Sequence, residues 1–75
     1  MKKYRFEIVY QTKEMIEVAD WLRTFDFDME EIAIKHTVIL TSRKEPTVDE
    51  IKDAMYKAFV LSEGRLLHIE GGLVE

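Results

Sequence analysis

An alternation of polar and apolar side chains at residues 3–10 limits, more than any other feature, what this chain can fold into. The apolar positions are aromatic or β-branched: Tyr4, Phe6, Ile8 and Tyr10. Successive side chains of a strand point to opposite faces, so this period of two predicts a strand with one buried face. We expect a strand over residues 2–10, with four side chains on its other face: Lys3, Arg5, Glu7 and Val9.

Residues 13–24 have the apolar spacing of an amphipathic helix. The apolar stripe consists of Met15, Val18, Ala19, Leu22 and Phe25. Thr12 is the expected N-cap, and Glu14 stands in the first turn, where the helix dipole favours a negative charge. We expect Trp21 to cover the margin of the core with its indole N–H near solvent. The alternative is an anchor for a partner.

A second helix is predicted over residues 48–62. Thr47 and Glu50 form a T-x-x-E capping box at its start. The predicted buried stripe is Ile51, Ala54, Met55, Ala58 and Phe59. Gly64 stands where a C-cap glycine belongs.

Residues 30–42 have no residue that would break a strand, but one strand of that length would outrun the helices covering it. We therefore expect a hairpin with the loop Lys35-His36-Thr37, and one long bent strand is the alternative. The expected register pairs Ile34 with Val38 and Ile32 with Leu40 on the inner face. The outward positions are then Glu31, Ala33, Ile39 and Thr41.

A last strand is predicted over residues 65–70, ending at Gly71-Gly72. Leu67 and Ile69 share its inner face. The outward positions are Leu66, His68 and Glu70. Residues 1–72 then form one domain, and residues 73–75 a short tail.

The resulting order, β-α-β-β-α-β, resembles the ferredoxin-like fold. That resemblance implies an α+β domain in which two helices pack on one face of a four-stranded antiparallel sheet. It covers nearly the whole chain and rests on the pattern alone. Since this fold carries many functions, the function must be argued from the sheet face that the helices leave open.

The composition limits the cellular location, the chemistry and the partners expected of this domain. The 75 residues contain no cysteine, carry a formal net charge of −4 and lack an apolar stretch of membrane-spanning length. We expect a cytoplasmic protein without a signal peptide, outside the membrane and without thiol chemistry. The acidic balance disfavours general binding to nucleic acid.

Two families with this topology provide the alternative functions. RNA-recognition domains stack bases on aromatic residues of the two central strands, but our registers turn Tyr4 and Phe6 inward. A register error of one residue would expose them. Amino-acid-sensing ACT-like domains typically use a glycine-bearing turn after the first strand, and residues 10–13 have no glycine.

Neither the histidines nor the acidic stretch DFDMEE at residues 26–31 has the spacing of a catalytic or metal site. We expect no cofactor and no metal. Asp26 and Asp28 should share one side of a sheet edge, where their charges discourage strand-to-strand aggregation. The alternative is an acidic contact for a basic partner.

The sequence therefore favours a non-enzymatic protein-interaction module, such as an adaptor, an assembly factor or an inhibitor of the kind that phages and mobile elements encode. A homodimer is the expected state. The contact residues expected on the open face and the acidic edge are Arg5, Val9, Ile39, Thr41, Leu66, His68, Asp26 and Asp28.

Overall fold

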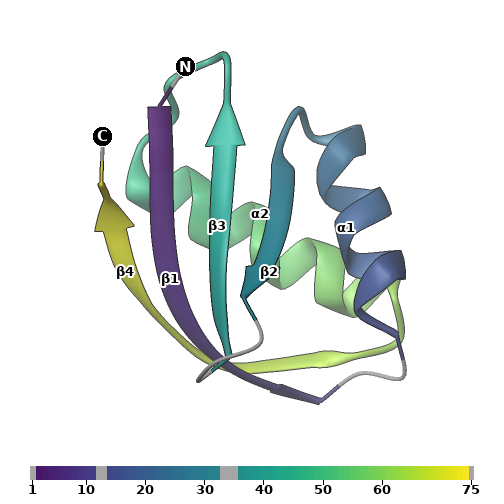
Figure 1. Ribbon diagram of the computed structural model, residues 1–75. Coiled ribbons are helices and arrows are strands. Elements are labelled where there is room, and N and C mark those ends of the chain that lie inside the picture. Colours follow the sequence, from purple (N-terminus) through teal and green to yellow (C-terminus); the bar gives the residue numbers. More distant parts are fainter. Residues whose placement is uncertain (1, 12–13, 33–35, 75) are drawn as a thin grey trace.

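The computed structural model describes residues 2–11, 14–32 and 36–74. Its elements are β1 (Lys2–Gln11), α1 (Met15–Thr24), β2 (Asp28–Ile32), β3 (Thr37–Ser42), α2 (Val48–Leu61) and β4 (Arg65–Leu73). The strands form one antiparallel sheet in the order β2-β3-β1-β4. In Figure 1 helix α2 passes behind the strands and α1 lies beyond the β2 edge, so neither helix covers the face of the sheet toward the viewer. This is the predicted α+β ferredoxin-like fold.

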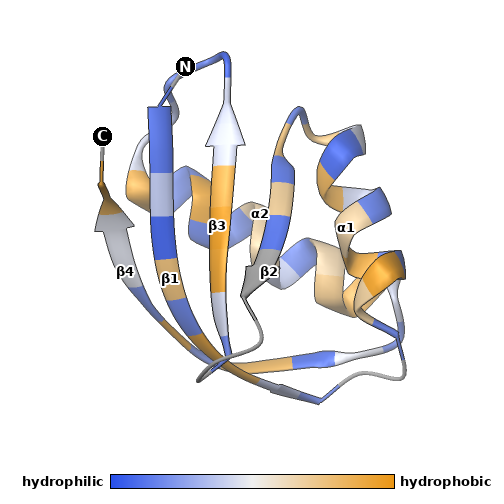
Figure 2. Ribbon diagram, viewed as in Figure 1, coloured by the Kyte–Doolittle hydropathy of each residue, from blue (hydrophilic) through white to orange (hydrophobic). Residues whose placement is uncertain are grey.

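The core fills the space between the helices and the covered face of the sheet. Tyr4, Phe6 and Ile8 of β1 are at most 3% exposed, so the predicted inner face of this strand is confirmed. Figure 2 shows hydrophilic and hydrophobic bands alternating along β1. The predicted stripe of α2 is also buried in full. Removing these apolar side chains from water supplies the main force that holds the two layers together.

The start of α1 differs from the prediction. The helix begins at Met15, and Glu14 is its N-cap, without a side-chain capping hydrogen bond. Thr12, the expected cap, lies outside the described residues. The pairing of Gln11 with Arg65 keeps the chain extended up to Gln11, so the helix starts at the first residue of its apolar stripe and later than a cap at Thr12 would place it. Trp21 is 37% exposed, which does not decide between the core-margin position and the partner anchor.

The capping box of α2 is confirmed. The Glu50 amide donates to Thr47 Oγ1 at 3.2 Å, and the Thr47 amide donates to Glu50 Oε1 at 3.3 Å. The other end of the helix corrects the prediction, because the left-handed residue is Glu63, at φ 60°, and not Gly64. The Gly64 amide instead donates to the Phe59 carbonyl at 2.8 Å, which closes a Schellman motif.

Helix α1 ends in the same way, again with an acidic residue in the left-handed position. Asp26 has φ 68° and donates its amide to the Arg23 carbonyl at 3.0 Å. The Phe27 amide donates to the Leu22 carbonyl at 2.9 Å, and the Phe27 side chain is buried. Asp26 therefore belongs to a helix cap and not to the extended edge that the sequence predicted.

The hairpin of β2 and β3 is confirmed against one long strand, but its register is not the predicted one. Leu40 pairs with Met29 instead of Ile32, and Val38 pairs with Glu31. The helix cap is the reason: it places Phe27 in the core, β2 begins at once, and Met29 takes the next inward position. Ala33, Ile34 and Lys35 lie outside the described residues, and Thr37 is the first residue of β3, not part of the loop.

Strand β4 also departs from the prediction. A register shift between Val9 and Tyr10 leaves Leu67 without a partner, and Leu66 packs into the core, although we expected it on the open face. The strand does not end at Gly71-Gly72 but continues to Leu73. The expected tail is likewise tied to the sheet, because the Val74 amide donates to the Lys3 carbonyl at 2.8 Å.

Candidate functional site

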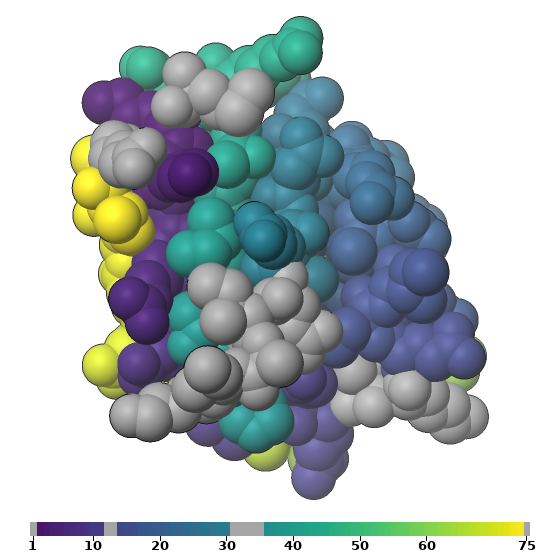
Figure 3. All heavy atoms as spheres, in the orientation of Figure 1, coloured from purple at the N-terminus to yellow at the C-terminus, as the bar shows by residue number. Residues whose placement is uncertain are grey.

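The open face of the sheet is the larger of two candidate sites. Directly opposed residues of paired strands share a face, so the register defines rows of side chains across it. Two rows, which we call the open-face rows, cross β2, β3 and β1 in that order: Asp28–Thr41–Lys3 and Glu30–Ile39–Arg5. In Figure 3 atoms of these three strands lie side by side on the face toward the viewer.

The open-face rows separate opposite charges into two columns. Asp28 and Glu30 form an acidic column on the edge strand β2, and Lys3 and Arg5 form a basic column on β1; all four are exposed. Strand β3 lies between them with a half-buried Ile39 and Thr41. Neighbouring strands are about 4.8 Å apart, so nearly 10 Å separates the two columns. The ion pairs found among the described residues do not join the two columns.

The rest of the open face is formed mainly by β1 and β4. Val9, which is 52% exposed, lies opposite His68. Glu7 lies opposite Glu70, and His68 Nε2 is 3.1 Å from Glu70 Oε2. Directly opposed like charges repel, and the His68 imidazole supplies Glu70 with a hydrogen-bonding partner beside Glu7.

Most of the predicted face residues are found where the sequence placed them. Arg5, Val9, Ile39, Thr41 and His68 all occupy open-face positions. Leu66 does not. The sequence also gave the outward position on β2 to Glu31, which in the structure pairs with Val38, while Glu30 holds the position opposite Ile39. The missed signal is Phe27, whose place in the core after α1 sets the phase of β2.

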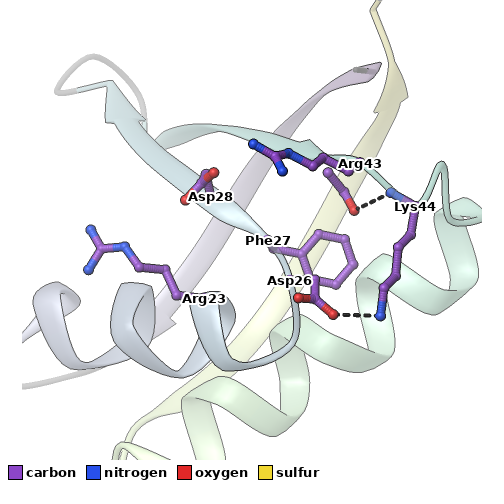
Figure 4. Close-up of a pocket in the computed structure, with 7 residues that line it drawn as sticks. Arg23, Asp26, Phe27, Asp28, Arg43 and Lys44 are labelled. Atoms are coloured by element: carbon purple, nitrogen blue, oxygen red, sulfur yellow. Dashed lines mark hydrogen bonds and ion pairs between the residues drawn. The ribbon is translucent and has the colours of Figure 1, made fainter.

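A surface pocket of about 400 Å³ is the second candidate site. It lies between the end of α1 and the turn after β3, and its lining residues are Arg23, Asp26, Phe27, Asp28, Ser42, Arg43 and Lys44 (Figure 4). Lys44 Nζ lies 2.6 Å from Asp26 Oδ2, and the Lys44 amide donates to Ser42 Oγ at 3.2 Å. The Asp26 carboxylate accepts a hydrogen bond from the Lys44 ammonium and attracts its charge, which raises the pKa of Lys44.

The pocket changes the interpretation of the acidic stretch. Asp26 and Asp28 do lie close enough to line one cavity, but Asp26 is occupied by Lys44. Asp28 belongs to the open face, where it lies opposite Thr41. The two aspartates thus have different roles: one ties the end of α1 to the turn after β3, and the other extends the acidic column.

Metal ligands and membrane spans were also sought in the described part of the chain. No group of three or more His, Cys, Asp or Glu side chains there is arranged to hold a metal ion. The ring of His36 packs edge-on against Tyr10, with centroids 5.5 Å apart, and His68 contacts Glu70. Neither helix in the described residues is long and apolar enough to cross a membrane.

Comparisons of this chain with protein-family models, with curated proteins and with solved structures gave no match. The class to which it belongs is therefore defined by its architecture: an α+β domain of ferredoxin-like topology. Its distinguishing features are the charge columns of the open face and the Asp26–Lys44 pair beside it.

Proposed function

We propose that this chain is a non-enzymatic protein-binding module that recognises its partner through the open face of its sheet. The observation that carries the proposal is the position of Ile39, half-buried at the centre of the face between Arg5 and Glu30. An apolar centre with a charged surround is the usual composition of a protein interface. The module would act as an adaptor, an assembly factor or an inhibitor, in the cytoplasm.

The charge columns give such a surface its selectivity. Complementary charges orient a partner and exclude wrong ones, even where each exposed pair adds little affinity. A protein is favoured over nucleic acid as the partner because Tyr4 and Phe6 of the central strand β1 are buried under the helices. Stacking of bases on an RNA-recognition sheet requires aromatic side chains on the open face.

A comparison of two aspartate substitutions tests the proposal. Ile39→Asp places a charge in the centre of the open face, and Val60→Asp places one on the outer surface of α2, where the side chain is 70% exposed. In a pull-down from the cells that produce the protein, we expect Ile39→Asp to lose the bound protein and Val60→Asp to keep it. Circular dichroism verifies that both variants are folded, and Arg5→Glu replaces Ile39→Asp if that variant unfolds.

Two results would contradict this function. Equal retention by the folded Ile39→Asp and Val60→Asp variants would move the contact away from the open face. Saturable binding of labelled single-stranded RNA that weakens steeply with salt would support the nucleic-acid alternative instead.

A further inference from the structure

The partner of the open face can be specified further, and this step rests on the proposed function. We propose that the open face binds a second copy of this chain, face to face, with the two-fold axis close to the direction of β3. The basis is the separation of the acidic column on β2 from the basic column on β1, with the neutral residues of β3 midway between them.

The geometry of a face-to-face pair follows from its two-fold axis, which lies in the plane between the two sheets. If the axis is parallel to β3, the rotation exchanges the two sides of that strand but keeps each position along it. Asp28 then faces Lys3 of the second copy, and Glu30 faces Arg5 of the second copy. Ile39 meets Ile39 of the second copy on the axis, and each charge contact occurs twice because the interface is isologous.

The orientation with the axis across the strands is disfavoured by the same charges. That rotation keeps each column on its own side, so the acids at Asp28 and Glu30 would face the acidic column of the second copy. The basic column would likewise face itself. Like charges placed opposite each other in an interface are costly, so the charge pattern favours one of the two orientations.

The distances in such a pair are within reach of these side chains. Stacked sheets pack about 10 Å apart, and their mean strand directions differ by about 30°. The rows of the two copies therefore cross near Ile39 instead of coinciding. Lys3 and Arg5 have long flexible side chains that can span this offset and bury their aliphatic stems over the neighbouring strand.

The composition of this contact also determines how strongly the two copies should associate. The contact has one aliphatic centre and otherwise exposed charge pairs, each of which is weak and screened by salt. We therefore expect a dimer with a dissociation constant in the micromolar range or above that weakens at least tenfold between 50 and 500 mM salt.

Three charge variants test this arrangement. The acidic-face variant is Lys3→Glu with Arg5→Glu, the basic-face variant is Asp28→Lys with Glu30→Lys, and the swapped variant combines all four substitutions. By sedimentation equilibrium in low salt, each two-residue variant alone should associate at least tenfold more weakly than the natural chain. The swapped variant should associate with itself within about threefold of the natural dissociation constant, because its columns are exchanged but still complementary.

Mixing experiments examine the charge contacts of the dimer. The acidic-face and basic-face variants, which associate weakly alone, should form a mixed dimer when combined, since each column then faces the opposite charge. The absence of a mixed dimer would overturn the proposal, as would a folded swapped variant that stays monomeric.

A crosslinking experiment needs no change of charge. The chain has no cysteine, so Thr41→Cys introduces a single thiol beside the proposed axis. A short bismaleimide should join two copies through residue 41 and leave Val60→Cys, on the outer surface of α2, as a monomer. Equal crosslinking of both variants, or none at residue 41, would contradict a face-to-face dimer.

Failure of this inference is distinguishable from failure of the proposed function. If the natural chain stays monomeric at high concentration but still binds a different protein that Ile39→Asp abolishes, the second copy is excluded and the binding function stands. If the natural chain dimerises but neither Ile39→Asp nor any charge variant weakens the dimer, the second copy does not bind the open face and this inference is wrong. The proposed function also fails only if folded Ile39→Asp retains its partner in the pull-down.

Discussion

Leu66 lies directly opposite Tyr10 in the pairing of β4 with β1 and is 7% exposed, whereas its neighbour Leu67 has no partner and is 50% exposed. The register shift between Val9 and Tyr10 is typical of a β-bulge, which inserts one unpaired residue and increases the local twist. The bulge decides which leucine of this adjacent pair belongs to the core.

Alanine substitutions at these two leucines should therefore differ in their effect on stability. Leu66→Ala empties space in the core and should lower the free energy of unfolding by about 2–4 kcal/mol. Leu67→Ala removes only an exposed side chain and should cost less than about 0.5 kcal/mol. Urea denaturation followed by circular dichroism measures both, and a larger loss for Leu67→Ala would place the bulge elsewhere.

Gly71 and Gly72 should also differ when each is replaced by alanine. Gly71 has φ 148°, and a Cβ atom there would lie 2.0 Å from the Arg5 carbonyl oxygen. At Gly72 an added Cβ would meet only Val48 Cγ2, at 3.9 Å. Since a contact with backbone cannot be relieved by a rotamer change, Gly71→Ala should lower the melting temperature far more than Gly72→Ala. Equal shifts in a thermal melt would argue against the close approach of β4 and β1.

The left-handed Glu63 at the end of α2 offers a stabilising substitution. A side chain in this conformation costs roughly 1 kcal/mol relative to glycine, and a negative charge at a helix C-terminus is also unfavourable. We expect Glu63→Gly to raise the free energy of unfolding by about 1 kcal/mol. Glu63→Ala removes the charge but keeps Cβ, so it should recover less than half of this gain. An equal gain from both would assign the effect to charge alone.

The two helix N-termini should respond in opposite directions to substitution. Thr47→Ala removes the side-chain cap of α2 and should cost about 1 kcal/mol. Glu14→Ser supplies a capping hydroxyl to α1, whose N-cap has no side-chain hydrogen bond, and should stabilise the fold by up to about 1 kcal/mol. Chemical denaturation measures both, and destabilisation by Glu14→Ser would show that the glutamate has another role there.

The Asp26–Lys44 pair should contribute to stability only below alkaline pH. Asp26 raises the pKa of Lys44 in the folded state, so Lys44 binds its proton more tightly in the folded chain than in the unfolded chain. The contribution is full below the unfolded pKa of about 10.4 and is lost as the pH rises through the folded pKa. The stability difference between Lys44→Met and the natural chain should therefore shrink above that pH. Lys57→Met is the control, because the ion pairs found among the described residues do not include Lys57.

Local patterns in the sequence were sufficient to predict the faces of β1 and the start of α2. Alternation at residues 3–10 gave both faces of β1, and the Thr47–Glu50 box gave the start of α2. The inward positions of β2 could not be predicted in the same way, because they are set by the cap at the end of α1. The left-handed position of that cap is occupied by Asp26, whereas a glycine there would have indicated the helix end in the sequence. For the same reason Asp28 and Glu30 could not be assigned to one column of the open face from sequence.

The sequence by itself determined the topology and the inner faces of β1 and α2, because periodic burial is encoded by residues that are neighbours along the chain. Only the tertiary structure decided the phases of β2 and β4 and the opposed charge columns of the open face. The physical reason is that the register of an edge strand depends on which of its apolar side chains fit a core formed by segments distant in the sequence. Burial of Phe27 beside β2 and of Leu66 in β4 sets the registers of these two edge strands, and the registers in turn fix the positions of the open-face charges.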